Sequence, residues 1–199
     1  MTRRRQESYA ERRERRAAID DPEVVLEAAA RFLEARSRSV AEVRRRLGQA
    51  GYRAELIDGA IVRLTELGML DDATFGRAWV ESRDRAHPRG ERALRRELGL
   101  KGLGRELIDE LLDERRDGAA GTAGDVDAVA VDLAAAQRLL ARNARALDRV
   151  ADPRTRRQRA YALLARHGFD PDTCREAAAG LQSAIADATE DVDAGLTES

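Results

Sequence analysis

Cysteine and histidine are the side chains best suited to nucleophilic or metal chemistry, and the sequence contains only Cys174, His87 and His167. The spacings typical of zinc and iron sites, such as HExxH and CxxC, are absent, so no metal site is expected. A nucleophilic pair of Cys174 and His167 is one interpretation. The other, which we favour, is a small buried hydrophobic residue, because Cys174 takes the position of Ile57 and Ile108 in an internal repeat.

Phosphate loops and carboxylate pairs are the next candidates for a site. The glycines of Gly102–Gly104 lack the lysine and serine of a P-loop, and no predicted strand precedes them. Asp71 and Asp72 could bind a metal, but one of them is better placed to cap the helix that carries Phe75 and Trp79. The sequence therefore predicts no catalytic site, no cofactor, no metal and no small-molecule ligand.

Basic side chains that recur at matching places are the remaining candidates. One interpretation is contact with an acidic protein surface or with phosphates. The other is a solvated helix face neutralised by Glu42, Glu91 and Glu97, and the sequence leaves both open. The candidate contact residues are Arg44, Arg45, Arg89, Arg92, Arg95, Arg96, Lys101 and Arg105.

An internal repeat must position these side chains. A shift of 51 positions superimposes the first copy on the second, and a further shift of 66 reaches a weaker third copy that lacks the paired arginines. In each copy a helix ends at a glycine suited to a left-handed turn, and an apolar residue and a second amphipathic helix follow. The repeated leucines and glycines are Leu47, Gly51, Leu98, Gly102, Leu164 and Gly168.

Each helix pair is preceded by another helix, so the predicted fold is all-α, an elongated tandem of three helix-turn-helix-like units of three helices. The preceding helices are expected at Val24–Arg36, Asp72–Arg85 and Val126–Leu147. The expected segments are a basic arm over 1–20, disordered or a frayed helix, repeat 1 over 21–69, repeat 2 over 70–116, a flexible linker over 117–124, repeat 3 over 125–182 and an acidic disordered tail over 183–199.

Composition limits the class of protein. Ala, Leu, Arg and Glu dominate, and they favour helix. No apolar run is long enough to span a membrane, and a single cysteine suits a reducing compartment, so a cytoplasmic protein is expected. The net charge of −1 argues against strong binding to free DNA.

Taken in order and at their spacing, the motifs of the first two copies resemble the RecX family. The resemblance is strong over about Val24–Arg116 and weaker to about Leu181. The residues that carry it include Arg44-Arg45-Arg46-Leu47, Gly51-Tyr52, Leu56-Ile57, Leu67-Gly68-Met69-Leu70-Asp71-Asp72, Phe75, Arg83, Gly90, Leu94-Arg95, Leu98 and Lys101-Gly102-Leu103.

The resemblance implies a tandem of three-helix repeats and a monomeric, non-catalytic regulator of DNA repair, recombination and the SOS response. Such a protein binds the RecA nucleoprotein filament, inhibits the recombinase, ATPase and co-protease activities of RecA, and contacts single- or double-stranded DNA weakly. The alternatives are a stand-alone helix-turn-helix DNA-binding regulator and a structural scaffold for another partner.

Overall fold

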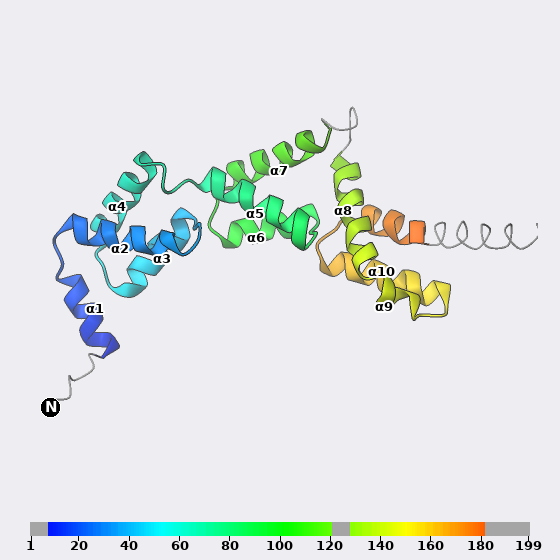
Figure 1. The fold of residues 1–199 in the computed structure, drawn as a ribbon, viewed down its shortest axis with the longest axis horizontal. Helices are drawn as coiled ribbons and strands as arrows, with labels where there is room; N and C mark the ends of the chain where they lie inside the picture. The colour runs from blue at the N-terminus through cyan, green and yellow to red at the C-terminus, as the bar shows by residue number, and fades with distance from the viewer. Residues whose placement is uncertain (1–7, 121–127, 182–199) are drawn as a thin grey trace, which may run out of the picture. The chain divides into compact units, whose positions relative to one another are not determined.

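The computed structural model describes residues 8–120 and 128–181, and these residues contain helices and no strands. A helical segment over residues 171–181 follows the labelled helices (Figure 1). The labelled helices are α1 (Tyr9–Ala17), α2 (Pro22–Glu34), α3 (Val40–Ala50), α4 (Ala54–Glu66), α5 (Asp72–Ala86), α6 (Glu91–Leu100), α7 (Arg105–Ala120), α8 (Ala128–Arg142), α9 (Ala144–Asp148) and α10 (Pro153–Arg166).

The chain forms two compact units whose boundaries fall inside helices. Unit 1 comprises Met1–Ala78 and Leu98–Leu107, and unit 2 comprises Trp79–Glu97 and Ile108–Ser199. Helices α5, α6 and α7 each begin in one unit and end in the other. The second three-helix repeat is therefore divided between the two units, and a compact unit is not the same thing as a repeat.

The middle helix of each repeat ends in the left-handed glycine turn predicted from the sequence. Gly51, Gly102 and Gly168 have φ values of 102°, 86° and 83°. The N–H group of the next residue reaches back to the leucine carbonyl of the preceding helical turn, a bond that completes a Schellman motif. These backbone bonds join Tyr52 to Leu47 at 3.2 Å, Leu103 to Leu98 at 3.2 Å and Phe169 to Leu164 at 3.3 Å.

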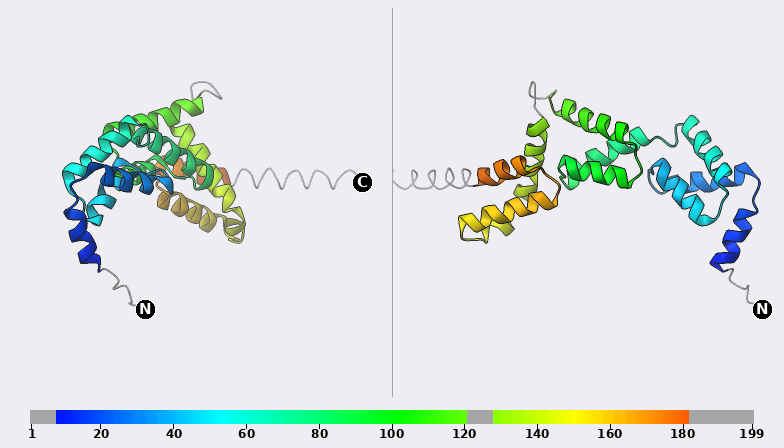
Figure 2. Two further views of the ribbon diagram at one scale, coloured as in Figure 1. Left: turned by 60° about the vertical axis from the view of Figure 1, so that its left-hand side comes forward. Right: turned by 180° about the vertical axis from the view of Figure 1, so that it is seen from behind.

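Each unit has its own hydrophobic core. In unit 1, helices α2, α3 and α4 lie against one another (Figure 2). Between them lie fully buried side chains such as Val25, Val43 and Leu64. In unit 2, alanines and leucines of α8 and α10 pack with Phe169 and Cys174, both of which are buried. These cores are small and aliphatic, as expected from the low aromatic content of the chain.

Two predicted segments differ from the structure. The helix predicted at Val126–Leu147 is two helices, α8 and α9, because Asn143 leaves helical geometry with φ −104° and ψ 6°. The side-chain amide of Asn143 donates from Nδ2 to the Leu139 carbonyl at 2.8 Å. The first part of the predicted linker, residues 117–120, is the last turn of α7, while residues 121–124 lie outside the described part of the chain.

The N-terminal arm and the acidic tail are described only in part. Within the arm, α1 is a capped helix in which Ser8 and Glu11 form a capping box. The Tyr9 hydroxyl donates to the Gln49 carbonyl at 2.9 Å, which fastens α1 to the end of α3. The predicted tail over 183–199 lies outside the described residues.

The end of α6 lies against the start of α3, and the end of α10 lies against the start of α6. In both cases the middle helix of one repeat meets that of the repeat before it. Ser39 Oγ donates to the Lys101 carbonyl at 2.6 Å within unit 1. Gly90 N–H donates to the His167 carbonyl at 3.1 Å within unit 2. The two pairs are related by the repeat shifts of 51 and 66, so the same junction is built twice. Close approach depends on the glycines: a Cβ on Gly102 would collide with Ala41, and one on Gly168 with Ala93.

A carboxylate from the following repeat completes each junction. Asp72, at the start of α5, accepts from the N–H of Val40 at 2.8 Å, and Asp132, in α8, accepts from the N–H of Glu91 at 2.9 Å. Val40 and Glu91 are the first residues of α3 and α6, whose N–H groups have no partner within the helix. The first helices of the second and third repeats, α5 and α8, therefore cap the middle helix of the repeat before them.

Replacing Gly102 with Ala is expected to destabilise the fold more than replacing Gly68, which also has a positive φ but open space around it. Gly68→Ala should cost about 1–2 kcal/mol for left-handed strain alone. Gly102→Ala should cost about 1–3 kcal/mol more, because its methyl group overlaps Ala41. Urea unfolding followed by circular dichroism measures both, and equal losses would show that the junction is not tightly packed.

Candidate partner-binding surface

The eight basic residues predicted as contacts divide equally between the two compact units. Unit 1 contains Arg44, Arg45, Lys101 and Arg105, and unit 2 contains Arg89, Arg92, Arg95 and Arg96. Four of the eight are held in ion pairs with carboxylates of their own unit, and the other four are exposed. Neutralisation within the chain therefore accounts for half of the set, and contact with a partner stays a prediction for the other half.

Arg44 and Arg95 form the same ion pair in two repeats. Arg44 Nη2 lies 2.5 Å from Asp58 Oδ1, and Arg95 Nη1 bonds to Asp109 Oδ1. Both partners are related by the shift of 51, so each pair joins the middle helix of a repeat to its third helix. Arg95 also pairs with Glu91, and these carboxylates, Asp109 first, raise the pKa of its guanidinium. Neither arginine presents an unneutralised charge.

Arg89 belongs to a half-buried cluster around Glu97. Arg89 Nε lies 3.4 Å from Glu97 Oε1, and Arg83 Nε lies 2.6 Å from Glu97 Oε2. The same carboxylate accepts from Trp79 Nε1 at 3.0 Å, and the Arg83 guanidinium lies over the indole ring, 4.4 Å from its centre. Trp79 is therefore only half-buried and takes part in a polar cluster, whereas Phe75, one helical turn earlier, is buried.

Lys101 is part of the junction within unit 1. Its Nζ lies 2.8 Å from Glu42 Oε1, and the two side chains are only 20% and 9% exposed. Burial alone would raise the pKa of Glu42, but hydrogen bonds from Lys101 and the Ser39 N–H, together with the charges of Lys101 and Arg36, outweigh burial and lower it. Lys101 thus stabilises the contact between repeats and offers little charge to a partner.

The four remaining arginines, Arg45, Arg92, Arg96 and Arg105, are exposed. No ion pair is recorded for any of them in the described part of the chain. Arg45 and Arg96 are related by the shift of 51, and each follows directly after an arginine that is neutralised within its own repeat. The repeated arginine pair therefore has two roles: the first member binds the third helix, and the second faces solvent.

The two aspartates of the sequence motif act in different helices. Asp71 caps α5 by accepting from the N–H of Ala73 at 2.8 Å and from the Thr74 hydroxyl at 2.6 Å, and these bonds, the one from Thr74 first, lower its pKa. Asp72 reaches α3 instead, as described above, and burial raises its pKa. The sequence predicted a cap for one helix, but the second aspartate caps another.

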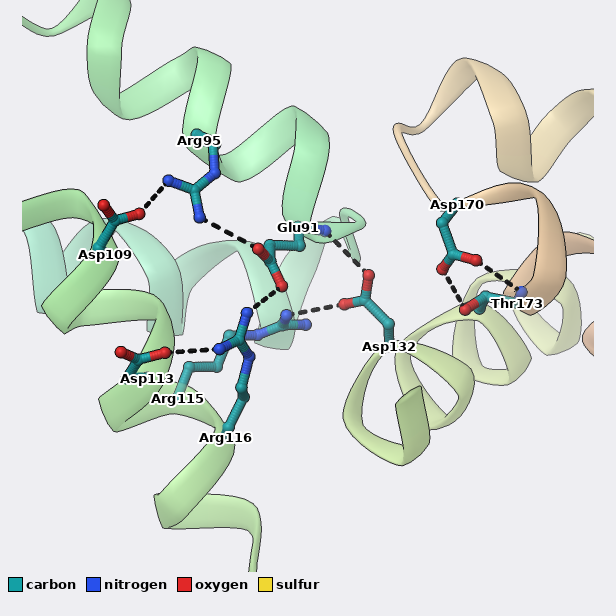
Figure 3. Close-up of polar contacts among 9 residues, drawn as sticks. All are labelled: Glu91, Arg95, Asp109, Asp113, Arg115, Arg116, Asp132, Asp170 and Thr173. Atoms are coloured by element: carbon teal, nitrogen blue, oxygen red, sulfur yellow. Dashed lines mark hydrogen bonds and ion pairs between the residues drawn. The ribbon is translucent and has the colours of Figure 1, made fainter. Parts of the chain in front are cut away.

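A buried arginine in α7 organises the carboxylates at the second junction (Figure 3). The Arg115 side chain is 7% exposed, contacts both oxygens of Asp84 at 2.9 Å and bonds to Asp132 Oδ1 at 2.8 Å. Its neighbour Arg116 lies 2.6 Å from Glu91 Oε2. Burial opposes the charge of Arg115, but its two aspartate partners outweigh burial and raise its pKa. This network was not predicted from the sequence.

Sequence analysis also missed the charge of the third repeat. Although the paired arginines are lost there, α10 contains five arginines and no carboxylate: Arg154, Arg156, Arg157, Arg159 and Arg166. The sequence contains this charge as a run of basic residues over 154–159. These arginines lie outside the positions that correspond to the paired arginines of the first two repeats. Helix α10 is the most basic of the three middle helices.

Groups that could perform catalysis lie in structural roles. Cys174 is fully buried in the unit 2 core, burial raises its pKa, and its Sγ contacts the Phe169 carbonyl at 3.7 Å. His167 Nδ1 lies 2.9 Å from the Leu163 carbonyl. Among the described residues, no hydrogen bond joins Cys174 to His167. These positions fit the interpretation of Cys174 as a buried hydrophobic residue.

Residues 8–120 and 128–181 contain neither a cluster suited to a metal ion nor a helix suited to span a membrane. Within these ranges no three His, Cys, Asp or Glu side chains are grouped so that they could hold a metal ion. Each helix there is too short or too polar to cross a lipid bilayer.

Family models match most of the described residues. Models of the first, second and third three-helix domains of RecX match residues 26–64, 71–112 and 130–178. Each matched range contains one of the three left-handed glycine turns, at Gly51, Gly102 or Gly168. The order of the three models along the chain is the order of the three repeats.

Curated relatives and solved structures carry the same family name. The chain is 32% identical over 159 residues to the regulatory protein RecX of Chlorobium phaeobacteroides, covering 80% of this chain and 94% of that protein. It is 33% identical over 146 residues to the one from Mycolicibacterium vanbaalenii, covering 70% and 72%. The crystal structure of RecX from Lactobacillus salivarius shares the fold, with a TM-score of 0.66, 18% identity and coverage of 82% and 97%.

Replacing Glu42 with Gln is expected to lower the free energy of unfolding at neutral pH by about 1–3 kcal/mol, because a charge-assisted bond to Lys101 is lost. Since the folded-state pKa of Glu42 lies below its ordinary 4.5, its contribution is complete above about pH 4.5 and disappears as the pH falls through the lower folded value. The difference between variant and parent should therefore narrow in acid.

Urea unfolding at a series of pH values measures this dependence. Glu27→Gln is the matched control, because the Glu27–Arg31 pair is largely exposed and should contribute little at any pH. A Glu42→Gln effect that persists unchanged in acid would contradict an electrostatic role for the pair.

Proposed function

The chain belongs to the RecX family of regulatory proteins, and from this we propose that it is a non-catalytic regulator that binds the RecA nucleoprotein filament. In this proposal it inhibits the recombinase, ATPase and co-protease activities of RecA, and so modulates DNA repair, recombination and the SOS response. It acts in the cytoplasm as a monomer and needs no cofactor. Support comes from the family and from the arrangement of arginines on the repeats.

The observation that carries the proposal is the recurrence of an exposed arginine beside a neutralised one. Arg45 and Arg96 lie at equivalent positions of successive repeats, with no recorded ion pair, while Arg44 and Arg95 are held by Asp58 and Asp109. A filament presents the same surface at regular intervals, and a tandem protein can contact several of them with the same residue. Linked weak contacts then add through a high effective concentration.

Arginine suits an acidic partner surface better than lysine would. Its planar guanidinium binds a carboxylate or a phosphate through two parallel hydrogen bonds, and these bonds are stronger than neutral ones. We therefore propose that Arg45 and Arg96 contact acidic groups of RecA, with Arg92 and Arg105 as additional contacts. The neutralised arginines set the geometry of the helices and leave the contact to their neighbours.

The alternative of a stand-alone helix-turn-helix regulator is disfavoured by charge. The helix that follows the turn would have to enter the major groove. In the second repeat this helix is α7, whose sequence contains six carboxylates and three arginines. One of those arginines, Arg115, is buried with Asp84 and Asp132. Such a helix would be repelled by the phosphates that line the groove.

ATP hydrolysis by RecA on single-stranded DNA, measured while this protein is titrated, tests the proposal. Inhibition at near-stoichiometric amounts is expected, and no inhibition together with no filament binding would refute it. The double variant Arg45→Ala/Arg96→Ala should raise the concentration for half-inhibition by about tenfold or more, because two charge-assisted bonds are lost.

The matched control is Arg44→Ala/Arg95→Ala, which removes the same charge from the same two helices. Because these arginines are already neutralised, the control should change the half-inhibiting concentration much less. The helical signal of both variants is checked by circular dichroism. Equal loss of inhibition in the two variants would mean that net charge, and not the exposure of Arg45 and Arg96, determines binding.

A further inference from the structure

Helix α10 differs in charge from the equivalent helices of the first two repeats. Helix α3 contains Glu42, and α6 contains Glu91 and Glu97, and all three carboxylates neutralise nearby basic groups. Helix α10 has five arginines and no carboxylate. Among the side chains of these five arginines, only that of Arg156 has a recorded hydrogen bond, from its Nε to the Val150 carbonyl at 3.0 Å. The other four arginines are exposed, and no partner of their side chains is recorded in the described part of the chain.

The third repeat has also lost the internal ion pair of the other two. The shifts of 51 and 66 carry Arg44 through Arg95 to Tyr161, and Asp58 through Asp109 to Arg175. Where the first two repeats have an arginine and an aspartate, the third therefore has a tyrosine and an arginine. Within the described part of the chain, the recorded ion pair of Arg175 is with Asp172 of its own helical segment, and both of these side chains are largely exposed.

Tyr161 and Arg175 line a pocket within unit 2. Its volume is about 430 Å³, and its wall includes Arg157 from α10 as well as Ala178 and Ala179 from residues 171–181. Arg154, Arg157 and Tyr161 follow one another at spacings of three and four, so they share one flank of α10. Ala160 and Leu164 face the core, and Arg159 and Arg166 lie on the opposite flank.

We propose that this arginine–tyrosine surface, defined as Arg154, Arg157, Tyr161 and Arg175, binds single-stranded nucleic acid. Arginine forks bind phosphates along the backbone, and a base can stack on the tyrosine in the pocket. A duplex keeps its bases paired and stacked, so it cannot present one to Tyr161. An acidic protein segment would use the arginines but would leave the apolar wall of the pocket without a function.

This inference does not depend on binding to RecA, because it concerns the free strand. It is tested with the full chain and a fluorescein-labelled oligothymidylate of about 20 nucleotides, long enough for one such surface. Anisotropy titrations at several salt concentrations give the affinity and its salt dependence. Because the net charge of the chain is −1, binding is expected to be weak and best measured at low salt.

Arg154→Ala/Arg157→Ala is expected to weaken binding by about tenfold and to reduce the slope of log affinity against log salt by about 1.4, the value for two phosphate contacts on a single strand. The control Arg159→Ala/Arg166→Ala removes the same charge from the other flank of α10 and should leave the slope unchanged. Tyr161→Ala should weaken binding by about tenfold, while Tyr161→Phe should retain it, because the ring is kept.

Three outcomes would overturn the inference. Equal effects of the two arginine double variants would indicate that net charge alone determines binding. If a duplex binds as tightly as the single strand and Tyr161→Ala does not weaken its binding, base stacking on Tyr161 is excluded. Displacement of the oligonucleotide by polyglutamate as readily as by unlabelled strand would indicate an acidic protein segment as the partner. The RecA titration is repeated with Arg154→Ala/Arg157→Ala to keep the two proposals distinct. If this variant loses binding to the oligonucleotide but still inhibits RecA, the surface on α10 is separate from the RecA contact.

Discussion

Close approach of successive middle helices is the constraint on which the rest of the structure depends. Gly102 packs against Ala41, and Gly168 packs against Ala93, with no room for a Cβ atom on either glycine. Both glycines also adopt a left-handed conformation, which ends one helix and turns the chain into the next. One residue type therefore meets two requirements, a backbone angle and a contact distance, and both recur in the second and third repeats.

The same junction orders the charges. Because the end of one middle helix meets the start of another, N–H groups that lack partners are brought beside carboxylates of the following repeat, Asp72 and Asp132. Lys101 reaches Glu42 in unit 1, and Arg115 joins Asp84 to Asp132 in unit 2. These half-buried and buried groups give each junction a specific register that the small aliphatic cores, formed largely of alanine and leucine, would define less sharply.

Internal neutralisation decides which charges remain for partners. A chain with almost equal numbers of acidic and basic residues has a net charge near zero, yet its exposed arginines are not evenly matched. In the first two repeats a carboxylate of the third helix forms an ion pair with one arginine of each pair. The other arginine, Arg45 or Arg96, is exposed to solvent. In the third repeat the partner carboxylate is replaced by Arg175, so the positive charge of α10 is left unneutralised. One repeated architecture thus leaves different sets of arginines exposed in different repeats.

The turns and caps were predictable from the sequence, because they depend on neighbouring residues. A left-handed glycine after Leu47, Leu98 or Leu164, and a cap at Asp71, are set by backbone angles and by hydrogen bonds that span one helical turn. The extent of α7 and the break at Asn143 were not predicted, because alanine-rich helix ends give weak local signals. The resemblance to a family followed from the order of these local motifs along the chain.

Only the tertiary structure decided which charges are paired. Arg44 and Asp58 are 14 residues apart, and Lys101 and Glu42 are 59 apart, so their contacts arise only when helices pack. Arg44 and Arg45 are adjacent and chemically identical, and the sequence could not separate the neutralised one from the exposed one. Their difference comes from direction around the helix, about 100° per residue, combined with the position of the third helix. Local sequence determines the helices and their ends, and packing determines what each side chain can still bind.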